Sequence, residues 1–189
     1  MLVEAKFIVL ESIDDAMLDA QRQRLYRWLR GQGIAVEQTS EPTRGPVGAL
    51  VRLCRQGRLQ IDLLSQVLFE VADRMDHLGC QDGILSWLAG GRHVLCTRYY
   101  LSSYARHLQH VDLDWLRKIH ARCRAPDLTL FLEIDPLLIK SSEALSNPKR
   151  LRENYEAVIK SAPAKIVLLS GDQEDIFDSC CRQIADLLG

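Results

Sequence analysis

The sequence predicts an α/β fold in which five parallel strands form one sheet covered by helices. Short apolar runs of strand length alternate along the chain with longer segments whose apolar residues recur at helical spacing. Parallel strands need crossover connections, and right-handed crossovers place helices on both faces of the sheet. Ligands of such folds bind at the carboxyl ends of the strands, where residues 11–19, 39–46 and 97–103 are expected to converge.

The first part of the chain predicts a buried strand followed by a long helix. Residues 5–10 are apolar except for Lys6, as expected of a parallel strand covered on both faces. Leu18, Leu25 and Leu29 then recur at helical spacing before Gly31, which marks the end of the helix. The elements expected after the first strand are helix 16–31, strand 34–38, a loop over 43–47, helix 47–56, helix 59–78 and helix 82–89.

The rest of the chain continues the same alternation, without an internal repeat or low-complexity tract. At 189 residues, with 47% apolar and 26% charged residues, the chain suits one domain over residues 1–189 with a sizeable core. The elements expected in this part are strand 92–97, helices 101–109 and 112–124, strand 127–133, a polar segment over 137–150, helix 148–161, strand 164–169 and helix 173–188.

The charge and the cysteines argue against several classes of function. A net charge of −1 gives no general attraction to nucleic acid or to anionic membranes, so neither partner is expected. The six cysteines form no CxxC pair and no metal-type spacing with the five histidines, so no metal site is expected. No secretory signal or long apolar span lies near Met1, and reduced thiols in the cytoplasm fit best.

Residues 7–21, FIVLESIDDAMLDAQ, have the strand-turn-helix frame of a phosphate-binding loop, but the loop over residues 10–19 is degenerate. In the pattern GxxxxGK[ST], glycines let backbone N–H groups surround a phosphate, lysine neutralises its charge and a hydroxyl helps to hold magnesium. Ser12 and Met17 stand at the glycine positions, and Leu18 stands at the lysine position. The parts that bind a nucleoside triphosphate are therefore expected to be lost.

Carboxylates make the same segment electrostatically unsuitable for a polyphosphate. Asp14, Asp15 and Asp19 would all face the anion with no cation among them, and Asp19 also stands at the hydroxyl position of the pattern. The segment Ser12 to Asp15 also fits a helix-capping pattern, in which carboxylates stabilise the first turn. Of the two roles, capping is the one we expect for Asp14.

Four further segments extend the pattern along the chain. They read TSEP at 39–42, LFEVADR at 68–74, VLCTRYYLSS at 94–103 and PDLTLFLEIDP at 126–136. In this order and spacing the sequence resembles thymidylate kinase, whose members read roughly LEGIDGAGKTTQ, TREPG, FAADR, DRYxxSS and PDLTxxLDxxP. The resemblance covers residues 4 to about 160 and implies a P-loop kinase-like, three-layer α/β/α fold in a member that has lost its Walker A motif.

The resemblance also implies part of a site for a nucleoside monophosphate. Arg98 matches the DRY arginine that holds the acceptor's phosphate, and Arg74 matches the ADR arginine that contacts the base. For Arg98, a structural pairing with Glu11, Glu41 or Asp73 is an equal alternative. The residues expected to form this residual site are Glu41, Phe69, Arg74, Arg98, Ser102 and Ser103.

Other positions depart from the family's acceptor site. Ser40 replaces the arginine of TREP, Thr97 replaces the aspartate of DRY, and His107 falls where the family has glutamine. The aromatic residue that stacks on thymine in the family is Glu70 here, with Phe69 one place earlier and about 100° round the helix. These changes weaken the case for thymine recognition.

The donor side departs further. The family places a catalytic arginine in the phosphate loop or in an arginine-rich lid, whereas this chain has Asp15 in the loop and a short lid-equivalent segment over 137–152. Loss of such an arginine reduces rates by roughly 10³–10⁵. The basic residues at 149, 150 and 152 fit the solvated face of a helix better than a lid. The cations available in this segment are Lys140, Lys149, Arg150 and Arg152.

The sequence therefore favours a pseudokinase that binds a protein or a residual nucleoside monophosphate, with no catalytic residues and no cofactor. The alternative is an active thymidine monophosphate or nucleoside monophosphate kinase with an atypical donor site, which would use ATP and Mg²⁺ and take cations from residues 140–152 or from a partner chain. Because the family dimerises through helices on one side of the sheet, a homodimer or a heterodimer with a kinase-like or other protein is expected.

Overall fold

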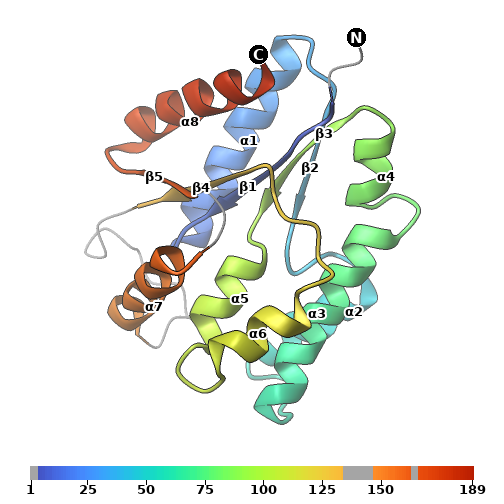
Figure 1. The fold of residues 1–189 in the computed structure, drawn as a ribbon, viewed down its shortest axis with the longest axis vertical. Coiled ribbons are helices and arrows are strands. Elements are labelled where there is room, and N and C mark those ends of the chain that lie inside the picture. The colour runs from blue at the N-terminus through green and yellow to red at the C-terminus, as the bar shows by residue number, and fades with distance from the viewer. Residues whose placement is uncertain (1–3, 134–146, 163–165) are drawn as a thin grey trace.

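A five-stranded parallel sheet forms the centre of the structure (Figure 1). The computed structural model describes residues 4–133, 147–162 and 166–189. The strand order is β2-β3-β1-β4-β5, and every neighbouring pair is parallel, as the sequence predicts. The strands are β1 (Phe7–Glu11), β2 (Val36–Ser40), β3 (His93–Thr97), β4 (Leu128–Leu132) and β5 (Ile166–Leu169).

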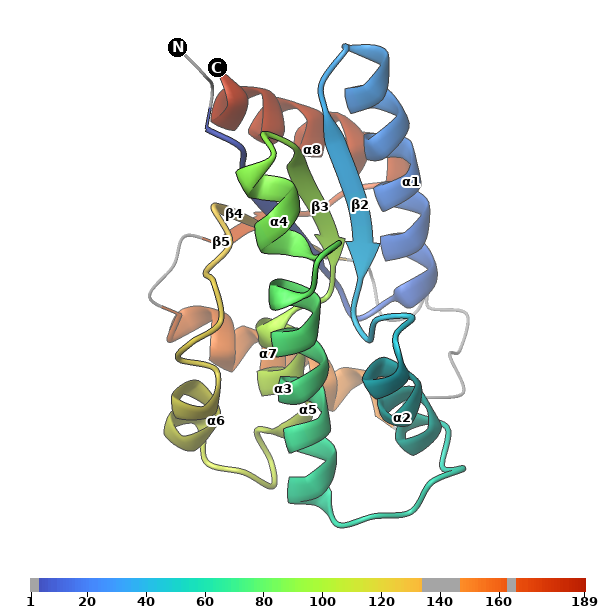
Figure 2. The same cartoon turned by 90° about the vertical axis from the view of Figure 1, so that its right-hand side faces the viewer.

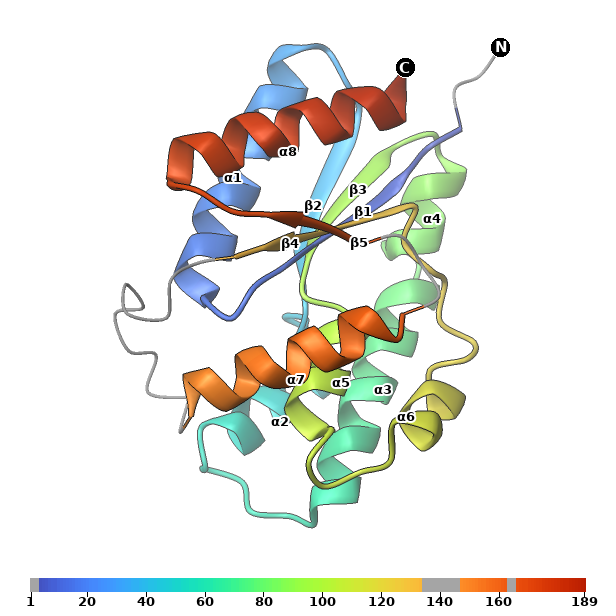
Figure 3. The ribbon, with the colours of Figure 1, turned by 60° about the vertical axis from the view of Figure 1, so that its left-hand side comes forward.

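Helices cover both faces of the sheet, so the three-layer α/β/α arrangement is confirmed. Figure 3 shows α1 and α8 on one face and α3, α5 and α7 on the other, while Figure 2 shows α2 beside α3 beyond the end of β2. No helix of the described residues is long and apolar enough to cross a membrane. The helices are α1 (Asp15–Gly31), α2 (Pro46–Arg55), α3 (Leu63–Gly79), α4 (Ile84–Ala89), α5 (Tyr100–His107), α6 (Leu113–Ile119), α7 (Pro148–Lys160) and α8 (Gln173–Leu188).

The core lies on both sides of the sheet because every residue of β1 is buried. Ile8 and Leu10 pack with apolar residues of α1 and α8 on one face. Phe7 and Val9 pack on the opposite face with residues of α3 and α4. Successive side chains of a strand point to opposite faces, which explains why the first four residues of this doubly covered strand are all apolar.

Strands β1, β2 and β3 end side by side at one edge of the sheet. Thr97 at the end of β3 is in register with Leu10 of β1 and with Ser40 of β2. The connections that leave these strands therefore begin at neighbouring points. This confirms the expected convergence and positions the polar residues described next.

Candidate functional site

The first turn of α1 is capped by the side chain of the residue that precedes the helix. Asp14 is the N-cap, and its side chain accepts hydrogen bonds from the backbone N–H groups of Ala16 (2.8 Å) and Met17 (3.2 Å). The capping role expected for Asp14 is confirmed, whereas Ser12 has a different role. Its hydroxyl donates to the Leu132 carbonyl at 2.8 Å and thereby ties this turn to the end of β4. Two N–H groups at the helix opening are thus bonded to a carboxylate within the protein.

The residues that follow the turn after β1 lie partly in the core. Met17 and Leu18 are only 3% and 1% exposed and pack in the cluster between the sheet, α1 and α8. Asp19 lies on the surface and forms an ion pair with Arg22 at 3.2 Å. Met17 and Leu18 of α1 therefore contribute apolar contacts to the core.

Arg98 bridges the end of β3 and the start of α1. Its guanidinium forms an ion pair with Asp15 and donates to the Ser12 carbonyl at 3.2 Å and to the Tyr155 hydroxyl at 3.4 Å. The Arg98 side chain is only 6% exposed, and its backbone has a φ of 63°, a left-handed conformation unusual for a residue other than glycine. The hydrogen-bonded partner of Arg98 is therefore Asp15, rather than any of the three carboxylates considered from the sequence.

Glu11 is a fully buried carboxylate beside Arg98. It accepts hydrogen bonds from the Tyr99 N–H at 2.9 Å, the Ser102 N–H at 3.3 Å and the Tyr155 hydroxyl at 3.3 Å. Burial raises the pKa of Glu11 to about 7, although the charge of Arg98 acts in the opposite direction. Sequence reasoning treated Glu11 only as a possible counter-ion. The signal that could have found it is a carboxylate at the end of a wholly apolar strand.

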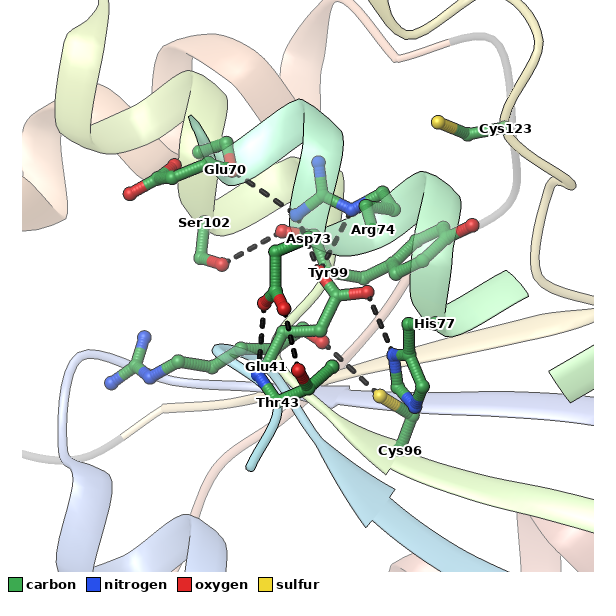
Figure 4. Close-up of polar contacts among 12 residues, drawn as sticks. Glu41, Thr43, Glu70, Asp73, Arg74, His77, Cys96, Tyr99, Ser102 and Cys123 are labelled. Atoms are coloured by element: carbon green, nitrogen blue, oxygen red, sulfur yellow. Dashed lines mark hydrogen bonds and ion pairs between the residues drawn. The ribbon is translucent and has the colours of Figure 1, made fainter. Parts of the chain in front are cut away.

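A second buried ion pair joins α3 to the loop after β2 (Figure 4). Arg74 lies 2.6 Å from Glu41 and also donates to the Ser103 hydroxyl at 3.2 Å. The other oxygen of Glu41 is 3.1 Å from His77 Nδ1. Glu41, Arg74 and Ser103, three of the residues predicted for the monophosphate site, therefore lie together. Arg74 contacts both of the others.

The third ion pair lies at the position where the resemblance places a stacking aromatic residue. Glu70 is 7% exposed, lies 2.8 Å from Arg55 and 3.3 Å from His107, and belongs to α3. Burial raises the pKa of Glu70, but Arg55 and His107 outweigh this effect and hold it well below the ordinary range. Phe69 is half-buried and is not among the residues that line the cavities described below.

A cavity of about 270 Å³ opens at the carboxyl ends of the strands. Its guanidinium groups are already engaged, since Arg98 is paired with Asp15 and Arg52 donates to the Thr43 carbonyl. Among the described residues, no group of three or more His, Cys, Asp and Glu side chains could hold a metal ion. The residues lining this cavity are Asp15, Leu18, Asp19, Ser40, Glu41, Pro42, Arg52, Arg55, Gln56, Thr97 and Arg98.

Comparison with known proteins identifies the family to which these features belong. The family model described as thymidylate kinase matches residues 11–174 of the chain. The chain belongs to the thymidylate kinase family. A probable thymidylate kinase of Pyrococcus horikoshii is 34% identical to it over 97% of this chain and 98% of the relative. A thymidylate kinase of Thiobacillus denitrificans is 30% identical over 100% and 98% of the two chains.

A solved structure shares the thymidylate kinase fold. The crystal structure of thymidylate kinase from Ehrlichia chaffeensis superimposes with a TM-score of 0.77 at 21% identity, covering 96% of this chain and 98% of that one. At this level of identity the comparison supports the fold alone.

Within this family frame, the predicted site residues fall into two groups. Glu41, Arg74 and Ser103 match family motif positions and contact one another. Ser102 matches a motif as well, but its hydroxyl donates to the Tyr99 carbonyl at 2.8 Å. Asp15 belongs to the second group, because it departs from the thymidylate kinase pattern and forms its ion pair with a motif arginine. Asp15 therefore offsets the charge of Arg98.

The lid-equivalent segment 137–152 is represented by its last residues only, because Lys140 and its neighbours lie outside the described residues. Arg152 forms ion pairs with Glu133 at 3.3 Å and with Glu156 at 3.2 Å. These contacts agree with the alternative that the basic residues here form a solvated helix face.

Proposed function

We propose that this thymidylate kinase family member has lost ATP-dependent phosphoryl transfer and acts as a binding protein, a pseudokinase in the cytoplasm. The observation that carries the proposal is the ion pair between Asp15 and Arg98. The guanidinium that would hold the acceptor's phosphate is paired with an internal carboxylate. A phosphate must displace this carboxylate before it can form the two-pronged contact that arginine makes with anions.

The donor side supports the same proposal because the residues present do not fit ATP and Mg²⁺. The carboxylate of Asp14 accepts from N–H groups at the helix opening, where a phosphate loop would present them to the triphosphate. A buried Leu18 takes the lysine position, and Asp15 and Asp19 add negative charge around it. We therefore assign no step of phosphoryl transfer to this chain.

An active nucleoside monophosphate kinase is the second candidate, and the comparisons favour it, since the relatives found are named thymidylate kinases. The retained pair of Arg74 and Glu41 also agrees with this candidate. Such an enzyme would need donor-side cations from residues 140–152 or from a partner chain. The two candidates differ in whether ATP-Mg binds and is consumed.

Thermal melts with ATP-Mg, combined with an assay of ADP formation, decide between the two candidates. A ligand at a hundredfold its Kd stabilises a protein by about 2.7 kcal/mol. We expect no rise in melting temperature at millimolar ATP-Mg and no ADP above background with thymidine monophosphate as acceptor. An active thymidylate kinase assayed in parallel is the positive control. Turnover dependent on this chain would establish the second candidate instead.

The proposed binding role includes a protein partner, and a homodimer is our first choice. Three large apolar side chains on α3, Leu64, Leu68 and Met75, are between 41% and 49% exposed. Their spacing of four and seven residues places them along one stripe of the helix. Exposed apolar stripes of this kind mark interaction surfaces. A heterodimer with a kinase-like or other protein would use the same stripe.

A further inference from the structure

A second cavity, of about 410 Å³, lies between α3, α5 and α7. Arg55 of α2 lines both this cavity and the one at the strand ends, so the two are neighbours. The volume is in the range of pockets that hold small molecules. We call it the helical cavity, and its charged and titratable lining residues are Arg55, Glu70, Arg106, His107, His110 and Arg150.

The lining of the helical cavity has an excess of cations. Its single carboxylate, Glu70, is already matched by Arg55 and His107. Arg106 forms no hydrogen bond or ion pair with any other described residue, and its Nε is buried. Arg150 lines the cavity as well, without a carboxylate partner in the described part of the chain. Arg106 is half-buried and Arg150 is exposed, so both guanidinium groups are available at the cavity wall to form charge-assisted hydrogen bonds with an anion.

The surroundings of Arg106 compensate its charge only in part within the described residues. Burial lowers the pKa of Arg106 to about 10, and the nearby charges of Arg55 and Arg98 act in the same direction. Tyr155 and Glu70 act in the opposite direction, but they do not offset the lowering of the Arg106 pKa. Arg98 and Arg55 each form an ion pair with a carboxylate, whereas Arg106 forms none with a described residue. Arg106 is therefore the cation best able to pair with an anionic ligand.

We infer that the helical cavity binds a small molecule carrying phosphate or carboxylate groups, held by the guanidinium groups of Arg106 and Arg150. The inference deepens the proposed binding role and rests on it, because an active member of the family would keep this region for an uncharged base. Glu70 and His107, which stand where the family has an aromatic residue and a glutamine, make the cavity polar. A polyanion satisfies such a lining better than thymine does.

Calorimetric titration at low ionic strength tests this inference with three probes. Pyrophosphate and citrate represent phosphate and carboxylate ligands, and thymidine is the uncharged probe. We expect at least one anion to bind and thymidine not to bind. Arg106→Gln is expected to weaken the anion about tenfold or more, the loss of one charge-assisted contact. The matched control, Arg122→Gln, removes an exposed arginine outside the cavity and leaves the affinity unchanged.

Folding of the variant is checked by its melting temperature, which we expect to equal or exceed that of the wild type, because a cation that is only partly compensated is removed. If Arg106→Gln melts lower, Arg150→Gln replaces it in the titration, since that side chain is exposed. The inference is overturned if neither anion binds, or if both cavity variants bind the anion as tightly as the wild type does.

ATP is itself a polyanion, so the same variant separates this inference from the proposed function. Stabilisation by ATP-Mg that persists in Arg106→Gln would contradict the loss of the donor site and leave the helical cavity untouched. If the stabilisation by ATP-Mg disappears in Arg106→Gln, ATP binds in the helical cavity, and the result does not contradict the loss of the donor site.

Discussion

At the scale of single residues, the ion pair between Asp15 and Arg98 is the contact on which the proposed function depends. The carboxylate comes from the first residue of α1 and is about half-exposed, whereas the guanidinium is buried. The Arg98 side chain is held toward α1 by this ion pair and by its hydrogen bond to the Ser12 carbonyl. The affinity for a phosphate should therefore depend on the presence of the Asp15 carboxylate.

Replacing Asp15 by alanine should free Arg98 for a phosphate. We expect Asp15→Ala to bind thymidine monophosphate at least about tenfold more tightly than the wild type, since a charge-assisted contact is typically of this size. Calorimetry measures the change. Asp19→Ala is the control, because Asp19 lines the same cavity but pairs with Arg22. Equal affinities in the wild type and both variants would show that the ion pair does not govern ligand binding.

Glu11 should make the stability of the protein depend on pH. Its folded-state pKa of about 7 lies above the ordinary value of 4.5, so the folded state binds the proton more tightly than the unfolded state does. The stability from this group is fully present below pH 4.5 and is lost as the pH rises through about 7. Glu11→Gln, which imitates the protonated form, should be more stable than the wild type at pH 8 by a few kcal/mol.

Urea denaturation at pH 4.5 and pH 8 measures this effect. The difference in unfolding free energy between Glu11→Gln and the wild type should shrink toward zero at the lower pH. Comparing the two proteins at each pH removes the contribution of the other titrating groups. A difference that is the same at both values would mean that Glu11 does not titrate between them.

At the scale of secondary structure, we expect the opening of α1 not to tolerate the family's loop sequence. Leu18→Lys would place an ammonium group in the cluster between the sheet and α8, where Leu18 is 1% exposed. We expect this substitution to lower the unfolding free energy by about 2–5 kcal/mol, as removal of a buried leucine does. Asp19→Thr, at the exposed neighbouring position, should change it by about 0.5 kcal/mol or less. Chemical denaturation distinguishes the two, and equal stability would indicate that Leu18 can turn toward the cavity.

The order and type of the elements could be predicted from the sequence, because burial periodicity is a local property. Strand 5–10 and helix 173–188 correspond closely to β1 and α8. The partner of Arg98 could not be predicted in this way. It depends on which residue begins α1 and where β3 ends, and only the assembled sheet brings these two points together. The unmatched charge of Arg106 depends on the packing of three helices and was not expected.

At the scale of the whole molecule, the exposed stripe on α3 predicts self-association. Leu68→Glu would place a charge in the middle of the stripe formed by Leu64, Leu68 and Met75, where 49% of Leu68 is exposed. We expect a wild-type dimer and a Leu68→Glu monomer in sedimentation equilibrium, because desolvating the new charge opposes association. Leu168→Glu, on the strand at the edge of the sheet, is the matched control and should remain dimeric. A monomeric wild type at all concentrations would contradict the dimer and favour a different protein partner.

Under the proposed loss of the acceptor site, the ion pairs of Glu70 also restrict the order in which mutations could introduce a thymine site. Replacing Glu70 by an aromatic residue would leave Arg55 and His107 without their shared carboxylate, beside Arg106. Breaking a buried pair costs about 3–5 kcal/mol, a large part of the stability of an ordinary domain. The first step back would therefore be selected against before a second could compensate for it. Epistasis of this kind makes the departure from the ancestral acceptor site difficult to reverse.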